Sequence, residues 1–200
     1  MIGVIDYEAG NLASVTNALR SIDAGVVVSS DARELGRCSG IILPGVGAAP
    51  LAMHSLERRH LIGFIRTLEV PFLGICLGMQ VLFDESREGN TKCLGIVPGT
   101  VEEFDASASR VPHMGWNKVV FTADDSLTGT SVEDAYFYFA HSYYAPVGPA
   151  TTATTECGVS FSAAMKKDNY LGVQFHPEKS GRAGLLLLKG FCDLCESFQR

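Results

Sequence analysis

Two kinds of segment alternate along the chain and predict an α/β fold, in which a mostly parallel open sheet carries helices on both faces. In the first half of the 200 residues, short apolar runs alternate with segments of helical periodicity. Because those apolar runs are continuous, they fit strands that are buried on both faces of a sheet. From about residue 95, short β-rich pieces separated by Gly, Pro and Asp predict antiparallel β-hairpins added to the sheet edge.

The elements of the first half follow from the apolar pattern. Runs of Val, Ile and Leu predict strands at 2–6, 25–30, 40–47 and 70–76. Apolar residues at helical spacing predict helices at 11–22, at 49–68 in two pieces, and at 77–86.

The second half is expected to be rich in strands until a final helix. Alternating and aromatic-rich runs predict strands at 118–123, 135–140, 151–157 and 159–167. Another buried strand is expected at 169–175 and a closing helix at 181–198. No repeat or linker interrupts the chain, so residues 1–200 are expected to form a single domain.

Composition excludes several classes of function. The formal net charge is −6 without a basic cluster, so nucleic acid is not an expected partner. No apolar run reaches the roughly 18 residues of a membrane span, and no signal peptide is recognisable, so a cytoplasmic location is expected. The six cysteines should then be reduced. Cys192 and Cys195 lack the second ligand pair of a zinc site, and neither a metal nor another cofactor is expected.

Cys76 stands between Gly74 and Gly78, where the predicted strand changes into a helix. Gly-x-Cys-x-Gly resembles the nucleophile elbow Gly-x-Ser-x-Gly, in which the glycines leave room for a sharp turn. A helix N-terminus favours a thiolate, and the amide of Leu77 would point toward a developing oxyanion. The alternative is a buried core cysteine whose glycines only help packing.

A thiol nucleophile needs a base, and His176 is the preferred histidine. His54 and His60 fall in a charged helical segment and are expected at the surface, whereas His141 is a true rival. The proline after His176 favours an extended conformation, in which residues two apart share a side. Glu178 would then accept a hydrogen bond from the His176 ring and fix its tautomer. Alternatively, His176 has only a structural role, with its ring hydrogen-bonded at a strand end beside a solvated glutamate.

Ligands of open α/β sheets bind outside the carboxyl ends of the strands. Four segments are expected to meet there, namely 44–47, 76–78, 141–142 and 176–178. The backbone amides of Gly45, Val46 and Gly47 are candidates for a second oxyanion donor. The same residues could form only a turn after a strand.

Two motifs resemble those of the class I (triad) glutamine amidotransferases. "GICLGMQ" is similar to their nucleophile motif, and "FHPE", about 100 residues later, to their His-x-Glu motif. In order, "IDYEAGNLASV", "LPGVGA", "GICLGMQVLFDESREG", "PHMGWN", "YFYFAHSYY" and "GVQFHPEKSG" are similar to the glutaminase subunits of imidazole glycerol phosphate synthase. The resemblance covers nearly the whole chain.

The resemblance implies that Cys76 attacks the side-chain amide of glutamine, while His176 moves protons and Glu178 orients it. It also implies that Gln80 and Glu88 hold the substrate, Glu88 through the α-ammonium group. The strand end formed by His141, Ser142 and Tyr143 would lie along the substrate through its backbone. Gln80 could instead be a polar helix face, and Glu88 a loop charge.

Nothing in the sequence looks able to accept ammonia, because no Walker-type loop or dinucleotide fingerprint is present. The resemblance implies a heterodimer with a (β/α)8-barrel synthase (cyclase) subunit. That subunit would use the ammonia to make imidazole glycerol phosphate and an aminoimidazole carboxamide ribotide. The candidate interface residues are His113, Met114, Trp116, Asn117 and Lys179. Trp and Met are frequent at interface cores, although they could instead pack in the protein core.

Two other classes of function remain open at this point. One is a stand-alone cysteine hydrolase of similar fold, and the other is a regulatory binding module that has lost activity. The motif "PHMGWN" weighs against the first, and the intact set of Cys76, His176 and Glu178 weighs against the second.

Overall fold

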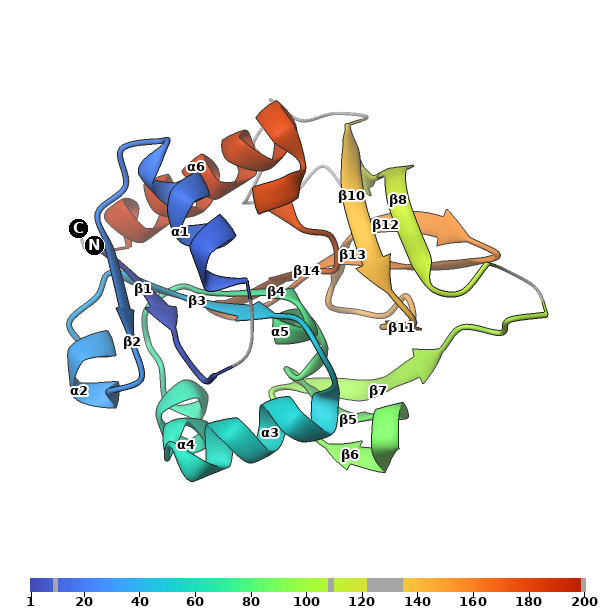
Figure 1. The fold of residues 1–200 in the computed structure, drawn as a ribbon, viewed down its shortest axis with the longest axis horizontal. Helices are drawn as coiled ribbons and strands as arrows, with labels where there is room; N and C mark the ends of the chain where they lie inside the picture. The colour runs from blue at the N-terminus through green and yellow to red at the C-terminus, as the bar shows by residue number, and fades with distance from the viewer. Residues whose placement is uncertain (9–10, 108–109, 122–134, 199–200) are drawn as a thin grey trace.

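The computed structural model describes residues 1–8, 11–107, 110–121 and 135–198. A mixed sheet organises them, with the strand order β2–β1–β3–β4–β14–β13–β12–β9 (Figure 1). Its parallel part consists of β1 (Ile2–Ile5), β2 (Val26–Ser29), β3 (Gly40–Gly45), β4 (Phe72–Cys76) and β14 (Tyr170–Val173). The antiparallel strands β13 (Val159–Lys167), β12 (Thr151–Cys157) and β9 (Val120–Phe121) extend one edge.

Helices cover both faces of the parallel strands, as the sequence predicts. Figure 1 shows α1 (Leu12–Arg20) and α6 (Gly181–Ser197) on one face. The opposite face carries α2 (Ala32–Leu35), α3 (Ala49–Arg58) and α4 (Leu61–Arg66). Each face has its own buried apolar cluster, so the strands between them are covered on both sides. None of the helices in the described ranges is long and apolar enough to cross a membrane.

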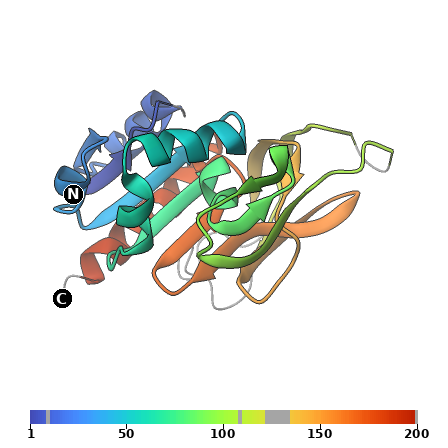
Figure 2. The ribbon, with the colours of Figure 1, turned by 90° about the horizontal axis from the view of Figure 1, so that it is seen from below.

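Two smaller sheets lie beside the antiparallel part. One pairs β8 (His113–Lys118) with β10 (Tyr136–His141), and the other has the order β11–β7–β5–β6. Its strands are β11 (Tyr143–Tyr144), β7 (Val97–Glu103), β5 (Phe83–Ser86) and β6 (Thr91–Lys92). In Figure 2, the blue and teal N-terminal segments lie toward one end of the molecule, and the green, yellow and orange strands toward the other. The predicted fold class is therefore confirmed.

The largest error of the sequence prediction is the helix expected at 77–86. The structure has only α5 (Leu77–Gln80), followed by strand β5, which pairs in parallel with β7. The run Val81–Phe83 is buried in either arrangement, so its apolar pattern cannot distinguish them. Residues 83–86 form a strand because they pair with β7, which was not predicted from the sequence.

Other differences are smaller. The sequence did not predict α2, and "PHMGWN" forms most of strand β8. The strand expected at 118–123 is divided between the end of β8 and β9. The last two residues of that expected strand, and two residues of the motif "IDYEAGNLASV", lie outside the described residues.

Candidate active site

Cys76 ends strand β4 in a strained turn. Its φ is 54° and its ψ is −109°, a conformation that a residue with a side chain rarely adopts. Such strain persists only where the surrounding packing imposes it, and it is characteristic of functional sites. The geometry agrees with the predicted nucleophile elbow.

The glycines around Cys76 are required by contact between backbones. A Cβ atom at Gly74 would meet the carbonyl oxygen of Gly78, and one at Gly78 would meet the carbonyl oxygen of Leu43. A Cβ atom at Gly45 would meet the backbone nitrogen of Gly78 and the side chain of Leu77. The ends of β3 and β4 therefore press directly on the start of α5. This contact brings the predicted oxyanion segment at 45–47 beside Leu77.

His176 interacts with a charged or ionisable side chain on both sides. Its Nδ1 lies 2.8 Å from Glu178 Oε1, and its ring interacts on the other side with Cys76. A carboxylate accepts a hydrogen bond from Nδ1, which leaves Nε2 for the sulfur. Burial alone would lower the pKa of His176, but the hydrogen bonds and negative charges of Cys76 and Glu178 raise that pKa to about 10. The arrangement favours an imidazolium beside a thiolate.

The route by which Glu178 reaches His176 differs from the predicted one. His176 is extended, with φ −102° and ψ 96°, as expected before a proline. Residues Pro177–Lys179, however, form a 3₁₀ turn instead of continuing the extended chain. The carboxylate reaches the ring because the chain folds back, and not because both residues share one side of a strand.

The short α5 also changes the electrostatic argument. A helix of four residues has a much smaller dipole than the predicted ten-residue helix, so it contributes little to thiolate stability. Leu77 is nevertheless the first residue of α5, where backbone amides have no partner within the helix. Its amide therefore remains a candidate oxyanion donor, while His176 supplies the positive charge.

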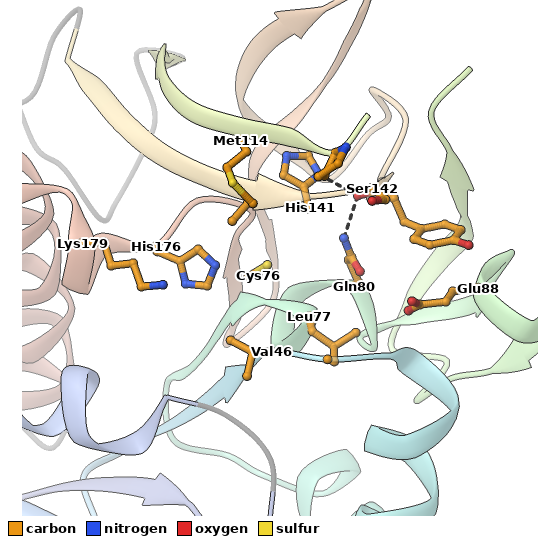
Figure 3. Close-up of a pocket in the computed structure, with 14 residues that line it drawn as sticks. Val46, Cys76, Leu77, Gln80, Glu88, Met114, His141, Ser142, His176 and Lys179 are labelled. Carbon is orange, nitrogen blue, oxygen red and sulfur yellow. Dashed lines mark hydrogen bonds between the residues drawn. The ribbon is translucent and has the colours of Figure 1, made fainter. Parts of the chain in front are cut away.

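The predicted rim segments meet around one cavity of about 350 Å³ (Figure 3). Its lining is Val46, Gly47, Cys76, Leu77, Gln80, Glu88, Pro112, Met114, Ala140, His141, Ser142, Tyr143, His176 and Lys179. In Figure 3, Cys76 lies between His176 and Gln80, and Glu88 lies beyond Gln80. The nucleophile, its base and the predicted substrate contacts thus share one cavity.

The two side chains predicted to hold substrate are themselves anchored. Glu88 Oε2 accepts a hydrogen bond of 2.7 Å from the backbone amide of Ala49, at the start of α3. Gln80 Nε2 donates to the backbone oxygen of Tyr143 at 2.8 Å and to Gln174 Oε1 at 3.0 Å. Glu88 keeps Oε1, and Gln80 keeps its own Oε1, for a ligand in the cavity.

His141 is excluded as the base that serves Cys76. Its Nδ1 donates to the backbone oxygen of Tyr143 at 2.7 Å, and its Nε2 faces His113 Nδ1 at 3.0 Å. Burial is the main cause that lowers the pKa of His141 to about 3, so the ring stays neutral. His54 and His60 are exposed, as predicted.

The candidate interface residues separate into two groups. Met114 and Trp116 are 65% and 57% exposed, so neither packs in the core. Trp116 contacts the ring of Tyr138 edge to face, and Lys179 Nζ lies 5.7 Å from that ring's centre. His113 alternates to the inner face of β8 and is buried. The Asn117 amide holds the His113 ring at 3.2 Å, and the assignment of both residues to the partner interface stays a prediction.

The sequence prediction missed Gln174. This side chain is fully buried, and its Nε2 lies 3.6 Å from Cys76 Sγ. A usable signal existed, because Gln174 precedes His176 by two positions at the end of a strand and so points to the same side.

Within the described residues, no group of His, Cys, Asp or Glu side chains could hold a metal ion. Cys192 and Cys195 both lie on α6, with Cys195 fully buried.

Comparisons with known proteins agree with this geometry. The sequence model of the family described as glutamine amidotransferase class-I matches residues 3–192. Imidazole glycerol phosphate synthase subunit HisH of Methanothermobacter thermautotrophicus is 46% identical over 198 residues, covering 97% of this chain and 98% of that protein. The HisH subunit of Idiomarina loihiensis is 42% identical over 191 residues, covering 96% of each chain.

Solved structures show the same fold at much lower identity. A crystal structure of a glutamine amidotransferase superposes with a TM-score of 0.76 at 16% identity and covers 98% of both chains. A glutamine amidotransferase from Thermotoga maritima has a TM-score of 0.62 at 17% identity, covering 99% of this chain and 84% of the other. The chain belongs to the class I glutamine amidotransferases and, within them, to the family of HisH subunits of imidazole glycerol phosphate synthase.

Proposed function

We propose that this chain hydrolyses glutamine to glutamate and ammonia, as the glutaminase subunit of imidazole glycerol phosphate synthase. The observation that carries the proposal is that Cys76 and His176 share one cavity and interact, while Glu178 hydrogen-bonds the far side of the His176 ring. In this arrangement, Cys76 is the nucleophile, His176 transfers protons, and Glu178 holds the ring in the tautomer that faces the sulfur.

In the first step, the Cys76 thiolate attacks the side-chain carbonyl carbon of glutamine. The carbonyl oxygen becomes an oxyanion, for which the amide of Leu77 and the backbone of Gly45, Val46 and Gly47 are the proposed donors. His176, already protonated, gives its proton to the departing nitrogen. The C–N bond breaks, ammonia leaves, and a glutamyl thioester remains on Cys76.

In the second step, His176 is neutral and can take a proton from water. The resulting hydroxide attacks the thioester carbon, the C–S bond breaks, and glutamate is released. The thiolate and the protonated His176 are thereby restored. Glu178 orients the ring and stabilises the positive charge that the ring carries when it is protonated.

Recognition of the substrate's amino-acid end is assigned to the far side of the cavity. Glu88 Oε1 is a suitable acceptor for the α-ammonium group, since Oε2 is held by Ala49. Gln80 offers an acceptor oxygen, because its amide hydrogens are used by Tyr143 and Gln174. The backbone of His141, Ser142 and Tyr143 forms the adjoining wall.

The HisH relatives are subunits, and we assign the partner of this chain to a (β/α)8-barrel synthase subunit. The exposed side chains of β8 and β10 beside the cavity are the proposed contact surface. They include Met114 and Trp116 of β8, with the half-buried Tyr138 of β10 and Lys179 next to them. Such a position would pass ammonia from Cys76 into the partner, where its nitrogen would enter imidazole glycerol phosphate and the aminoimidazole carboxamide ribotide would be released as the second product. The expected cytoplasmic location stays a prediction.

The experiment measures glutamate release from glutamine by the chain alone and with a barrel subunit and its ligand. Wild type should release glutamate, and Cys76→Ala should not. A glutamine-like electrophile should label Cys76 and abolish turnover. Full turnover by Cys76→Ala would contradict the proposal. Equal rates with and without the partner would instead favour a stand-alone hydrolase, and no turnover or labelling in any state would favour a binding module.

A further inference from the structure

A second side chain besides His176 contacts the sulfur of Cys76. Gln174 Nε2 lies 3.6 Å from Cys76 Sγ, a suitable distance for an N–H donor to sulfur. Gln174 is fully buried at the end of β14, so water cannot replace this contact without repacking. The nitrogen and oxygen of an amide have nearly the same shape, so the orientation of the group must come from its other contacts.

The neighbours of Gln174 determine that orientation. The backbone oxygen of Tyr143 can only accept, so the Gln80 atom that lies 2.8 Å from it must be the nitrogen. That nitrogen also lies 3.0 Å from Gln174, and it directs its second hydrogen there. Gln174 must therefore turn its oxygen toward Gln80 and its NH₂ group toward Cys76. The reversed amide would bring two NH₂ groups together.

The oxygen of Tyr143 also accepts from His141, which in turn is bonded to His113, and both histidines have fixed tautomers. His141 donates to this oxygen through Nδ1 and, being neutral, accepts at Nε2. His113 Nδ1 must then be the donor to His141, which leaves His113 Nε2 to accept from Asn117 Nδ2. Asn117 uses its other hydrogen on the backbone oxygen of Glu156, at 2.8 Å. Each donor in this network therefore has one assignment.

We propose that Gln174 is a further catalytic residue, which donates a hydrogen bond to the Cys76 thiolate and stabilises it. The proton stays on Gln174 throughout the reaction. The bond is strong while sulfur carries the charge and weak in the thioester, whose sulfur is a poor acceptor. It therefore favours formation of the nucleophile and, in the second step, departure of the sulfur as a thiolate. The reaction in which this bond acts is the glutamine hydrolysis proposed above.

The test is the pH dependence of Cys76 alkylation by iodoacetamide, in which the thiolate forms an S–C bond and iodide leaves. Peptide mass spectrometry separates Cys76 from the five other cysteines. Gln174→Met keeps the size of the side chain and removes the donor, and Gln174→Glu places a carboxylate at the same position. The control is Tyr170→Phe in β14, the strand that Gln174 directly follows. It removes a buried hydrogen bond of 2.7 Å from the Tyr170 hydroxyl to the backbone oxygen of Ile65.

The midpoint of alkylation should rise by about one pH unit in Gln174→Met and by more in Gln174→Glu, while Tyr170→Phe should match wild type. A Gln174 variant enters the comparison of alkylation midpoints if its unfolding temperature is as high as that of the Tyr170→Phe control. A midpoint in either folded Gln174 variant equal to wild type overturns the proposal. Alkylation does not involve glutamine, so the result is independent of whether the chain is a glutaminase.

Discussion

The two sides of the active site are built in different ways. On the Cys76 side, the turn is imposed by contacts between backbones, and glycines at 45, 74 and 78 make those contacts possible. On the His176 side, the geometry depends on side-chain hydrogen bonds, one local and others between residues far apart in the sequence. The first side should respond to added volume, and the second to lost or altered donors and charges.

The largest effect is expected from Glu178→Gln on the hydrogen-bonded side. The amide has the same shape but no charge, so it stabilises the imidazolium less and can present a donor to the ring. We expect kcat for glutamine hydrolysis to fall by roughly 10³- to 10⁴-fold with little change in the unfolding temperature. Steady-state glutamate release and thermal unfolding measure the two effects. A fall of less than tenfold would contradict the role given to Glu178.

The backbone side is tested by Gly78→Ala. The new methyl group would meet the carbonyl oxygen of Leu43, which cannot move without disturbing β3. The free energy of unfolding should decrease by about 3 kcal/mol. Gly63→Ala is the matched control, because a Cβ atom at that helical position meets nothing within 4 Å. It should stabilise the protein by about 0.5–1 kcal/mol, since alanine is the better helix former.

The sequence predicts the Cys76 side of the site better than the His176 side. The nucleophile elbow could be predicted because Gly74, Cys76 and Gly78 are close in sequence and a sharp turn requires them. His176 and Glu178 were also recognised from their spacing, although the predicted local conformation was wrong. The 3₁₀ turn at 177–179 and the Gln174 contact depend on packing across strands, which the sequence pattern does not express.

The errors in the fold have a similar cause. The helix expected at 77–86 ends early because strand β5 pairs with β7, a partner that the sequence did not predict. The orientation of β8 could have been predicted more closely, because residues alternate between its two faces. That alternation places Trp116 at the surface and His113 inside, so "PHMGWN" contributes to both an exposed face and a buried network.

The exposed face of β8 is tested by Trp116→Ala. Since Trp116 is 57% exposed, its removal should leave the unfolding temperature unchanged. Binding of the barrel subunit should weaken by about 2 kcal/mol, or roughly 30-fold, if Trp116 lies in the contact as proposed. Titration calorimetry with the partner measures this change. Leu51→Ala, which truncates a residue 67% exposed on α3, should bind as wild type does.

The smallest effect concerns the buried His141. Its pKa is about 3 in the folded protein, against an ordinary value of 6.5 in the unfolded chain. Between these pH values the unfolded chain binds one more proton than the folded protein. The stability that neutral His141 contributes is therefore fully present above pH 6.5 and is lost as the pH decreases from 6.5 toward 3. In His141→Gln, the slope of unfolding free energy against pH should decrease by about 1 kcal/mol per unit near pH 5. Gly63→Ala, which changes no titratable group, should leave the slope unchanged.

The charge state of His176 tests the central claim most directly. Histidine-selective ¹⁵N NMR of the full chain can follow both ring nitrogens of each histidine against pH. We predict that His176 keeps both ring protons through pH 8 and loses one near pH 10, whereas His141 is neutral throughout that range. In Cys76→Ala, the His176 transition should move to lower pH. A wild-type His176 that is already neutral at pH 8 would contradict the paired thiolate and imidazolium.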